Sequence, residues 1–363
     1  MNRYHLARVF VALFVFSAFL VSAALVANAA TYTWTGGGGD DLWTNPSNWG
    51  GTAPVSGDTG RFTSTGGGGD IDTGSATDTW GVTLDSGADG YSILGSGTLS
   101  GPFAYNTSGT NTLSTTITAS NNFALTGGGT LTIANGGRLT RGDTMSLNNA
   151  TVTVQSGGQF GGLQSDGSTA DRLRIESASG TNVVNIEAGG LLGLRNRLHM
   201  TGGNSNFTTI NNSGLMTVLE IELNNDNKRL LINDGGETEV TRVASGGLLK
   251  EGGDGTIDMW TSNATLALRG GDATVDTLPE FYALTGGGVG MDGNDFRYWD
   301  GASYVTFDSM TGSDWYTITH DTDYKGTGQA YTILQTQAIP EPTTLALGCF
   351  GLLGLLCCRR RRR

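Results

Sequence analysis

Hydrophobic and polar residues alternate along most of residues 70–335, a pattern typical of β-strands with one buried face. Five segments repeat one order: an alternating stretch, a turn of glycine and polar residues, and a second alternating stretch. The five begin at Thr130, Thr151, Val183, Thr208 and Leu230. The last glycines of their turns are Gly137, Gly158, Gly190, Gly214 and Gly236, which lie 21, 32, 24 and 22 residues apart. This spacing predicts successive turns of a right-handed parallel β-helix, or solenoid.

In a β-helix, alternate side chains point inward and stack on their equivalents one turn away. The pairs expected to do so are Leu131 with Ile133, Val152 with Val154, and Val184 with Ile186. Glycine and asparagine at the corners would supply the left-handed backbone that tight turns require. A β-sandwich of short strands joined by glycine hairpins is the alternative, because it produces the same alternation. One further repeat, FALTGGGT from Phe123 and YALTGGGV from Tyr282, stands apart from the five.

The alternation divides the chain into a solenoid over residues 70–273 and a less regular, aromatic-rich region over residues 274–337. We expect the second region to close the solenoid as a C-terminal β cap. Composition supports an all-β chain: glycine supplies 59 of 363 residues, and only 15% of residues are charged. A helical bundle needs more helix-forming residues, and the frequent β-branched and aromatic residues argue against a disordered protein.

Residues 1–29 have the layout of a secretory signal peptide. Arg3 and Arg8 precede an apolar run over residues 9–25, and Ala27 and Ala29 stand where signal peptidase requires small residues. An uncleaved membrane anchor is the alternative interpretation.

A second apolar run, residues 343–358, lies near the other end and predicts a transmembrane helix, although 16 residues of helix are slightly short for a bilayer. The basic residues that follow are Arg359, Arg360, Arg361, Arg362 and Arg363, and they would hold that end in the cytoplasm. Directly before the apolar run stand Pro340, Glu341 and Pro342.

This order of Pro-Glu-Pro, apolar helix and arginine cluster over residues 338–363 resembles the PEP-CTERM sorting signal of bacteria. The resemblance implies recognition and cleavage by an exosortase, a membrane peptidase, and release to the cell surface or extracellular matrix. Substrates of that kind are commonly linked to extracellular polysaccharide and biofilm. An ordinary C-terminal anchor with a proline-containing linker is the alternative.

Residues 30–69 are rich in tryptophan and glycine, with Trp34, Trp43, Asn48, Trp49, Pro54, Asp58 and Phe62 at intervals. The segment resembles the opening of autotransporter-like surface proteins that carry β-helical passenger repeats. Trp43 and Trp49 are interpreted as part of a cap over the open end of the solenoid. A sugar-stacking platform is the alternative.

Charge and cysteine content exclude several classes of partner. Without the two ends, 14 basic and 32 acidic residues remain, a net charge of about −18 that disfavours nucleic acid. The cysteines are Cys349, Cys357 and Cys358, all in the tail, so the body can hold neither a disulfide nor a thiolate zinc site.

No catalytic residue and no metal site is assigned from the sequence, and we expect no cofactor. His199 is interpreted as a solvated turn residue, and His320, beside Asp321 and Asp323, as part of a polar loop. The pairs Asp70 with Asp72 and Asp292 with Asp295 could serve a glycosidase, but such pairs arise freely among 32 acids. Calcium is the one metal considered: residues 252–258 and 292–295 each approach a calcium-loop template without completing it.

Two functions are therefore kept open. The first is a non-enzymatic, exported surface or matrix protein, structural or adhesive, whose partners are the exosortase and membrane during sorting and extracellular polysaccharide or cell-surface components afterwards. The second is a polysaccharide lyase or glycosidase on a β-helix. An enzyme would need acids and basic residues in one groove, and the candidate basic residues are Arg172, Arg174, Arg195 and Arg197. Because these arginines alternate along strands, a solvated face is the preferred interpretation.

Overall fold

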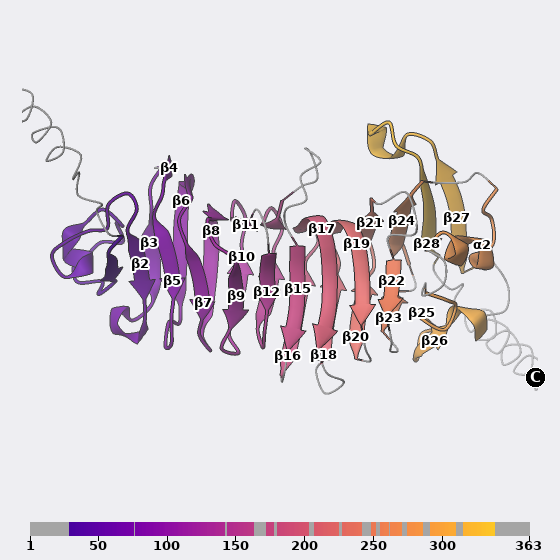
Figure 1. Cartoon of the computed structure of the whole chain (residues 1–363), viewed down its shortest axis with the longest axis horizontal. Helices are drawn as coiled ribbons and strands as arrows, with labels where there is room; N and C mark the ends of the chain where they lie inside the picture. The colour runs from indigo at the N-terminus through magenta and orange to yellow at the C-terminus, as the bar shows by residue number, and fades with distance from the viewer. Residues whose placement is uncertain are drawn as a thin grey trace, which may run out of the picture.

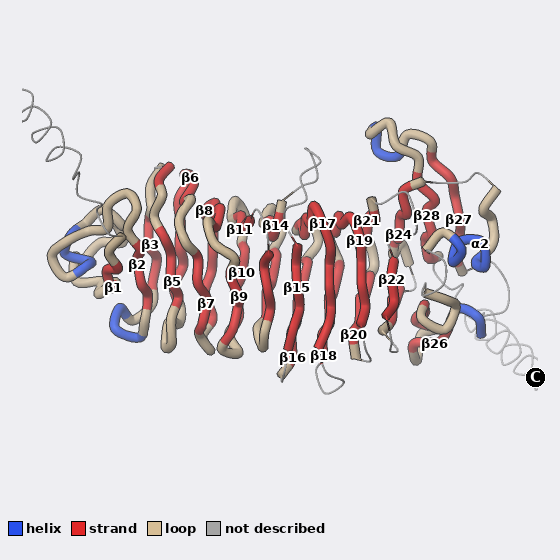
Figure 2. Tube along the Cα trace, in the orientation of Figure 1, coloured by secondary structure: helices blue, strands red, loops and turns tan. Residues whose placement is uncertain are grey.

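The computed structural model describes residues 29–337, apart from residues 76, 142–143, 163–171, 178–179, 203–206, 225–226, 242–247, 252–254, 261, 271–273, 286–290 and 310–314. The described part is an elongated parallel β-solenoid, with strands stacked side by side along its longest axis (Figure 1). Helix is confined to short segments at the two ends (Figure 2). The register is parallel from turn to turn, which excludes the β-sandwich alternative.

Each turn of the chain contributes a strand to three parallel ladders. The first ladder contains β3 (Gly69–Asp72), the start of β6 (Tyr91–Leu99), the start of β8 (Thr110–Ala119), β10 (Thr130–Ile133), β13 (Thr151–Val154), β16 (Thr181–Ile186), β18 (Phe207–Asn212), β20 (Lys228–Ile232), β23 (Thr256–Met259) and β25 (Phe296–Trp299).

The second ladder contains β4 (Thr77–Asp78), the ends of β6 and β8, β11 (Arg138–Arg141), β14 (Gln159–Gly161), the start of β17 (Leu191–Gly202), the start of β19 (Leu215–Asn224), β21 (Glu237–Val240) and β24 (Thr265–Arg269). The third contains β1 (Thr31–Thr33), β2 (Thr59–Phe62), β5 (Gly81–Leu84), β7 (Phe103–Asn106), β9 (Phe123–Thr126), β12 (Thr144–Leu147), β15 (Arg172–Ser177), the ends of β17 and β19, and β22 (Leu248–Glu251).

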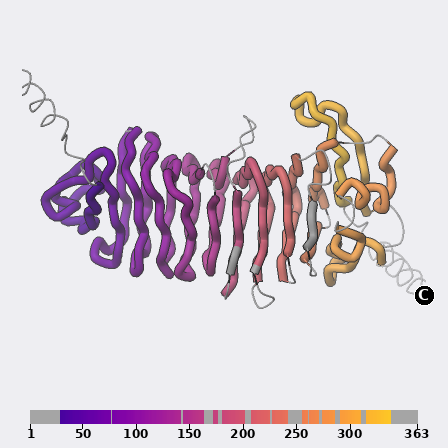
Figure 3. The backbone as a smooth tube through the Cα atoms, in the orientation of Figure 1, coloured from indigo at the N-terminus to yellow at the C-terminus, as the bar shows by residue number. Residues whose placement is uncertain are grey.

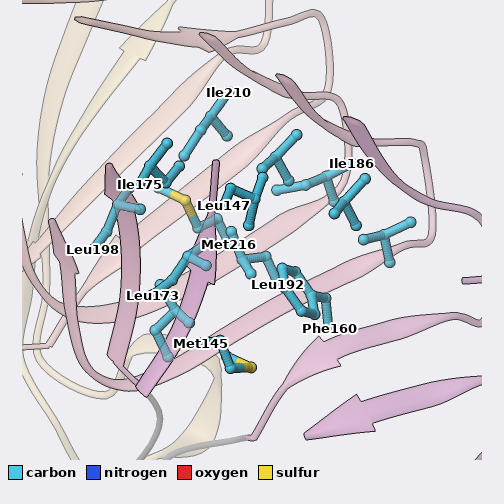
Figure 4. Packing of buried hydrophobic residues seen from close by; sticks show 14 of the residues in the cluster. Met145, Leu147, Phe160, Leu173, Ile175, Ile186, Leu192, Leu198, Ile210 and Met216 are labelled. Carbon is cyan, nitrogen blue, oxygen red and sulfur yellow. The ribbon is translucent and has the colours of Figure 1, made fainter. Parts of the chain in front are cut away.

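The core is a continuous column of apolar side chains along the axis. In the first ladder, Leu131 and Ile133 are in register with Val152 and Val154, which in turn face Val184 and Ile186. All six side chains are buried, as the alternation predicts. Figure 4 shows the same stacking in two further rows. Met145 is in register with Leu173, which is in register with Leu198, and Phe160 is in register with Leu192, which is in register with Met216. Each fully buried Leu, Ile or Phe stabilises the fold by about 1.5–3 kcal/mol.

The paired glycines of the turns serve two different purposes. The first of each pair has a left-handed backbone, with φ of 79° at Gly136, 75° at Gly157 and 69° at Gly235. The second lies against the backbone of the preceding turn of the solenoid. A Cβ on Gly236, for example, would lie 2.1 Å from the carbonyl oxygen of Asn212. The sequence pattern predicted the left-handed backbone of the first glycine but not the close approach between turns that the second glycine allows.

Aromatic side chains close the N-terminal end of the solenoid. Trp34, Trp43 and Trp49 are at most 5% exposed and pack against Phe62 and Trp80. The ring centroids of Trp43 and Trp49 are 4.8 Å apart. The short 3-10 helices η1 (Pro46–Trp49) and η2 (Ser64–Gly66) belong to this end.

At the other end, the chain leaves the solenoid and forms antiparallel pairs, as a cap requires. β28 (Tyr331–Thr336) pairs antiparallel with β24 and with β27 (Tyr316–Asp321), and β26 (Tyr304–Thr306) pairs antiparallel with β25. This end also holds α2 (Leu278–Ala283), η3 (Phe307–Ser309) and η4 (Tyr324–Gly326). The chain traverses the rod once, from the N-terminal cap to this closing sheet (Figure 3).

The echo between Phe123 and Tyr282 has no structural counterpart. The first copy forms β9, whereas the start of the second lies in α2. Thr277 and Glu280 form a capping box in front of α2, and Pro279 stands in its first turn. These helix-start signals favour a helix at the second copy, although the same apolar residues form a strand in the first.

No helix within the described ranges is long and apolar enough to cross a membrane. The predicted span at residues 343–358, the signal peptide with Ala27, and the Pro-Glu-Pro motif lie outside these ranges, so the structure does not test them. Ala29 is the first residue described.

Candidate functional site

The tryptophans of the N-terminal end do not form a sugar-stacking platform. The Trp43 side chain is 0% exposed and that of Trp49 is 5% exposed, so neither presents a ring face to solvent. Trp49 Nε1 donates to the carbonyl oxygen of Trp43 at 2.6 Å, and a Cβ on Gly60 would collide with both rings. These contacts fit the capping interpretation.

Polar side chains of residues 30–69 form hydrogen bonds that fix the loops of this segment. Asn48 is fully buried, and its side chain accepts from the Gly38 amide at 2.7 Å and donates to the carbonyl oxygens of Asp40 and Leu42. Asp58 accepts from the amide of Ala30 at 2.8 Å. The asparagine and aspartate of the motif are therefore structural residues of the cap.

The four arginines singled out in the sequence lie on neighbouring strands of the third ladder and at its corner. Arg172 and Arg174 belong to β15, and Arg195 and Arg197 belong to β17. Arg174 is exposed, and the other three are partly exposed. The fold therefore brings these basic residues onto two neighbouring strands, and their exposure fits the solvated face preferred from the sequence.

Two glutamates of the next strand, β19, complete this group. Arg197 donates to the carboxylate of Glu222, and its Nη2 lies 3.1 Å from Glu220 Oε1. Both glutamates are buried, at 2% exposed for Glu220 and 4% for Glu222. Because a buried carboxylate without a partner is costly, these contacts to Arg197 are needed for the fold.

His199 is part of this group, and its interpretation as a solvated turn residue was wrong. It lies in β17, in register with Arg174 on one side and Glu222 on the other. Its Nε2 is 3.2 Å from Glu222 Oε1 and 3.1 Å from Asn224 Nδ2. Burial lowers the pKa of His199 below its usual 6.5; Glu222 opposes this, and Arg174 and Arg197 add to it. The alternation of Arg197, Leu198, His199 and Met200 was the missed strand signal.

A second charged group lies on the first ladder near the C-terminal cap. Asp258 is fully buried and accepts from Arg297 Nε at 2.6 Å and from Arg229. The ring of Tyr304 covers Arg229 at 4.4 Å. Asp258 ends one of the two calcium-like segments, and its carboxylate is already bound by two guanidinium groups, so it does not offer a calcium ligand. Residues 252–254 of that segment lie outside the described ranges.

The other candidate acids organise their own loops. Asp292 accepts from the amide of Asn294 at 2.8 Å, and Asp295 accepts from the amide of Asp292 at 3.0 Å. Asp72 likewise accepts from the Gly74 amide. His320 lies in β27, facing Thr332 of β28, rather than in a polar loop. Within the described ranges, no three His, Cys, Asp or Glu side chains are placed to hold a metal ion.

Besides the pairing of β28 with β24, a lysine and a tyrosine join the closing sheet to the solenoid. Lys325 Nζ lies 2.5 Å from Glu239 and 2.8 Å from Glu237, both in β21, and the Tyr324 hydroxyl donates to Glu237. The two carboxylates raise the pKa of Lys325 although its burial opposes them. These contacts fix the loop between β27 and β28 on the outer face of the second ladder.

Comparison with protein families identifies the tail. The model of the PEP-CTERM protein-sorting motif matches residues 338–362, which include Pro340, Glu341 and Pro342 and four of the five terminal arginines. The resemblance to passenger repeats is confirmed only as far as the solenoid itself. The comparisons with curated proteins and with solved structures find no match. The motif implies an extracellular protein that is exported and sorted at the membrane by an exosortase.

Proposed function

We propose that the chain is a rod-like surface or matrix protein without enzymatic activity, which an exosortase cleaves at Pro340-Glu341-Pro342. The matched sorting motif carries this proposal. In it, residues 1–29 are removed after Ala29, residues 343–358 span the membrane, and Arg359 to Arg363 stop transfer at the cytoplasmic face. The released body reaches the cell surface or the extracellular matrix.

The fold supports a structural or adhesive role. Buried tryptophans at the N-terminal end and antiparallel strands at the other end limit end-to-end stacking of the solenoid. Its long, regular outer faces repeat similar polar side chains from turn to turn, so many weak contacts to a polymer or a neighbouring cell can add up to firm attachment. The buried acids described above are held by arginines, which suits a rigid scaffold.

The sorting part is tested in cells that have the exosortase and in cells that lack it. The Glu341→Gln and Pro342→Ala variants should remain in the membrane fraction, as the unaltered chain should when the exosortase is missing. Arg61→Gln, a surface change in the body, is the matched control and should be released normally. Equal release of the tail variants and the control would contradict exosortase sorting.

The polysaccharide-active enzyme remains the second candidate, because Arg197 lies beside Glu220 and Glu222, and Arg172 and Arg174 lie on the next strand. Release of reducing sugar, or absorbance from an unsaturated product, on a panel of acidic glycans decides between the two. Either signal, lost in a Glu222→Gln variant that still folds, would replace the structural proposal with the enzymatic one.

A further inference from the structure

The outer face of the third ladder carries a compact basic group on a strongly acidic body. Arg172, Arg174, Arg195 and Arg197 are four of the body's 14 basic residues, and they lie within 26 residues of sequence. The fold brings them onto two neighbouring strands, β15 and β17, about 4.8 Å apart. Counted with Glu176, Glu220 and Glu222 on the same three strands, the four arginines leave a net charge of +1, against about −18 for the whole body.

These side chains form two rows along the rod axis. In one row, Ser146, Arg174, His199 and Glu222 are in register across four successive strands. In the other row, Thr144 faces Arg172, and Arg197 faces Glu220. The first row therefore runs from Ser146 through Arg174 and His199 to the buried Glu222, and the second contains Thr144, Arg172, Arg197 and the buried Glu220.

The buried glutamates fix the geometry of this surface. Glu220 and Glu222 bind the guanidinium of Arg197 from the neighbouring strand β19, and the Arg197 side chain is still 29% exposed. The lowered pKa of His199 leaves it neutral at pH 7, so the arginines supply the positive charge. Arg174, the most exposed of the four, is flanked by Ser146 and His199, both of which offer hydrogen bonds to a sugar.

From this arrangement we propose that the surface of Ser146, Arg172, Arg174, Arg197 and His199 binds a carboxylated polysaccharide whose chain lies along the rod axis. Guanidinium groups bind carboxylates with paired hydrogen bonds. The spacing of successive strands is similar to the length of one sugar unit, so successive turns meet successive sugars. The inference deepens the adhesive role proposed above and rests on it.

The test uses the full-length protein in non-ionic detergent and sodium polygalacturonate as the probe, with affinity electrophoresis to measure Kd. Fully methyl-esterified polygalacturonate is the matched ligand, because it keeps the backbone and loses the charge. The protein should bind the acidic form at least tenfold more tightly, and added salt should weaken that binding.

Two variants locate the site. Arg174→Gln should weaken binding severalfold, and the double variant Arg172→Gln with Arg174→Gln at least tenfold, at an unchanged melting temperature. Arg61→Gln removes the same charge from an arginine that is 45% exposed elsewhere, and it should bind normally. If the double variant does not fold, Arg174→Gln alone decides.

Three results would overturn the inference: no binding of polygalacturonate, equal binding of its methyl ester, or equal weakening by Arg61→Gln. None of them affects the sorting proposal, which the release assay tests separately.

Discussion

The turn Asn233–Gly236 allows the two uses of glycine in this solenoid to be separated by experiment. Gly235 and Gly236 are neighbours, yet the structure requires them for different reasons. Gly235 has φ of 69°, and a Cβ there would point into open space. The Cβ of Gly236→Ala would lie 2.1 Å from the carbonyl oxygen of Asn212, which also accepts the hydrogen bond of the Asn233 amide at 2.8 Å.

The two costs can be worked out. At Gly235, alanine must adopt the left-handed conformation at about 1–2 kcal/mol, offset by about 0.4–1 kcal/mol from the less flexible unfolded chain, so the net loss is about 1 kcal/mol or less. At Gly236, overpacking costs about 1–3 kcal/mol and the lost hydrogen bond about 1 kcal/mol, with the same offset. The loss at Gly236 should therefore be about 1–3.6 kcal/mol.

Urea unfolding of Gly235→Ala and Gly236→Ala, followed by far-UV circular dichroism, measures the difference. Hydrogen exchange should in addition show lost protection of the Asn233 amide in Gly236→Ala only. Equal losses, or a larger loss in Gly235→Ala, would refute the view that close backbone approach between turns selects the second glycine.

Three further predictions follow from the contacts described. The pKa of His199 is lowered in the folded state, so the protein should lose stability as pH falls below about 6.5. In thermal melts, the His199→Gln variant should lose less stability between pH 7 and pH 5 than the unaltered protein. Lys325→Met should destabilise the closing sheet by about 1 kcal/mol or less, since the lysine is 41% exposed, and hydrogen exchange in β27 and β28 should rise. Trp43→Ala, in contrast, should cost about 3–5 kcal/mol in urea unfolding because the side chain is fully buried.

The repeating part of the fold could be predicted from the sequence because every turn repeats the same local rule. The alternation at Leu131 and Ile133, or at Val152 and Val154, fixes which face is buried, and the turn glycines fix the period. In contrast, the assignment of strands to three ladders depends on where each corner falls. β17 and β19 each contribute to two ladders, and neither glycine nor proline stands at their bends.

The charged groups were less accessible to sequence reasoning. The four arginines were identified, but Glu220 and Glu222, the partners of Arg197, lie more than 20 residues from it in sequence, and only the register brings them together. The contact of Lys325 with Glu237 depends on the chain folding back at the closing sheet, which no local pattern encodes. His199 was misread because its turn-like neighbours Arg195 and Asn196 obscured the strand that follows.

The central claim, sorting of a solenoid body by its tail, is tested most directly by the intact mass and terminal peptides of the protein recovered from the cell surface. A body that begins near Ala30 and ends near Pro342 is the predicted result. Recovery of the peptide with Arg359 to Arg363 on the surface-exposed protein would contradict it.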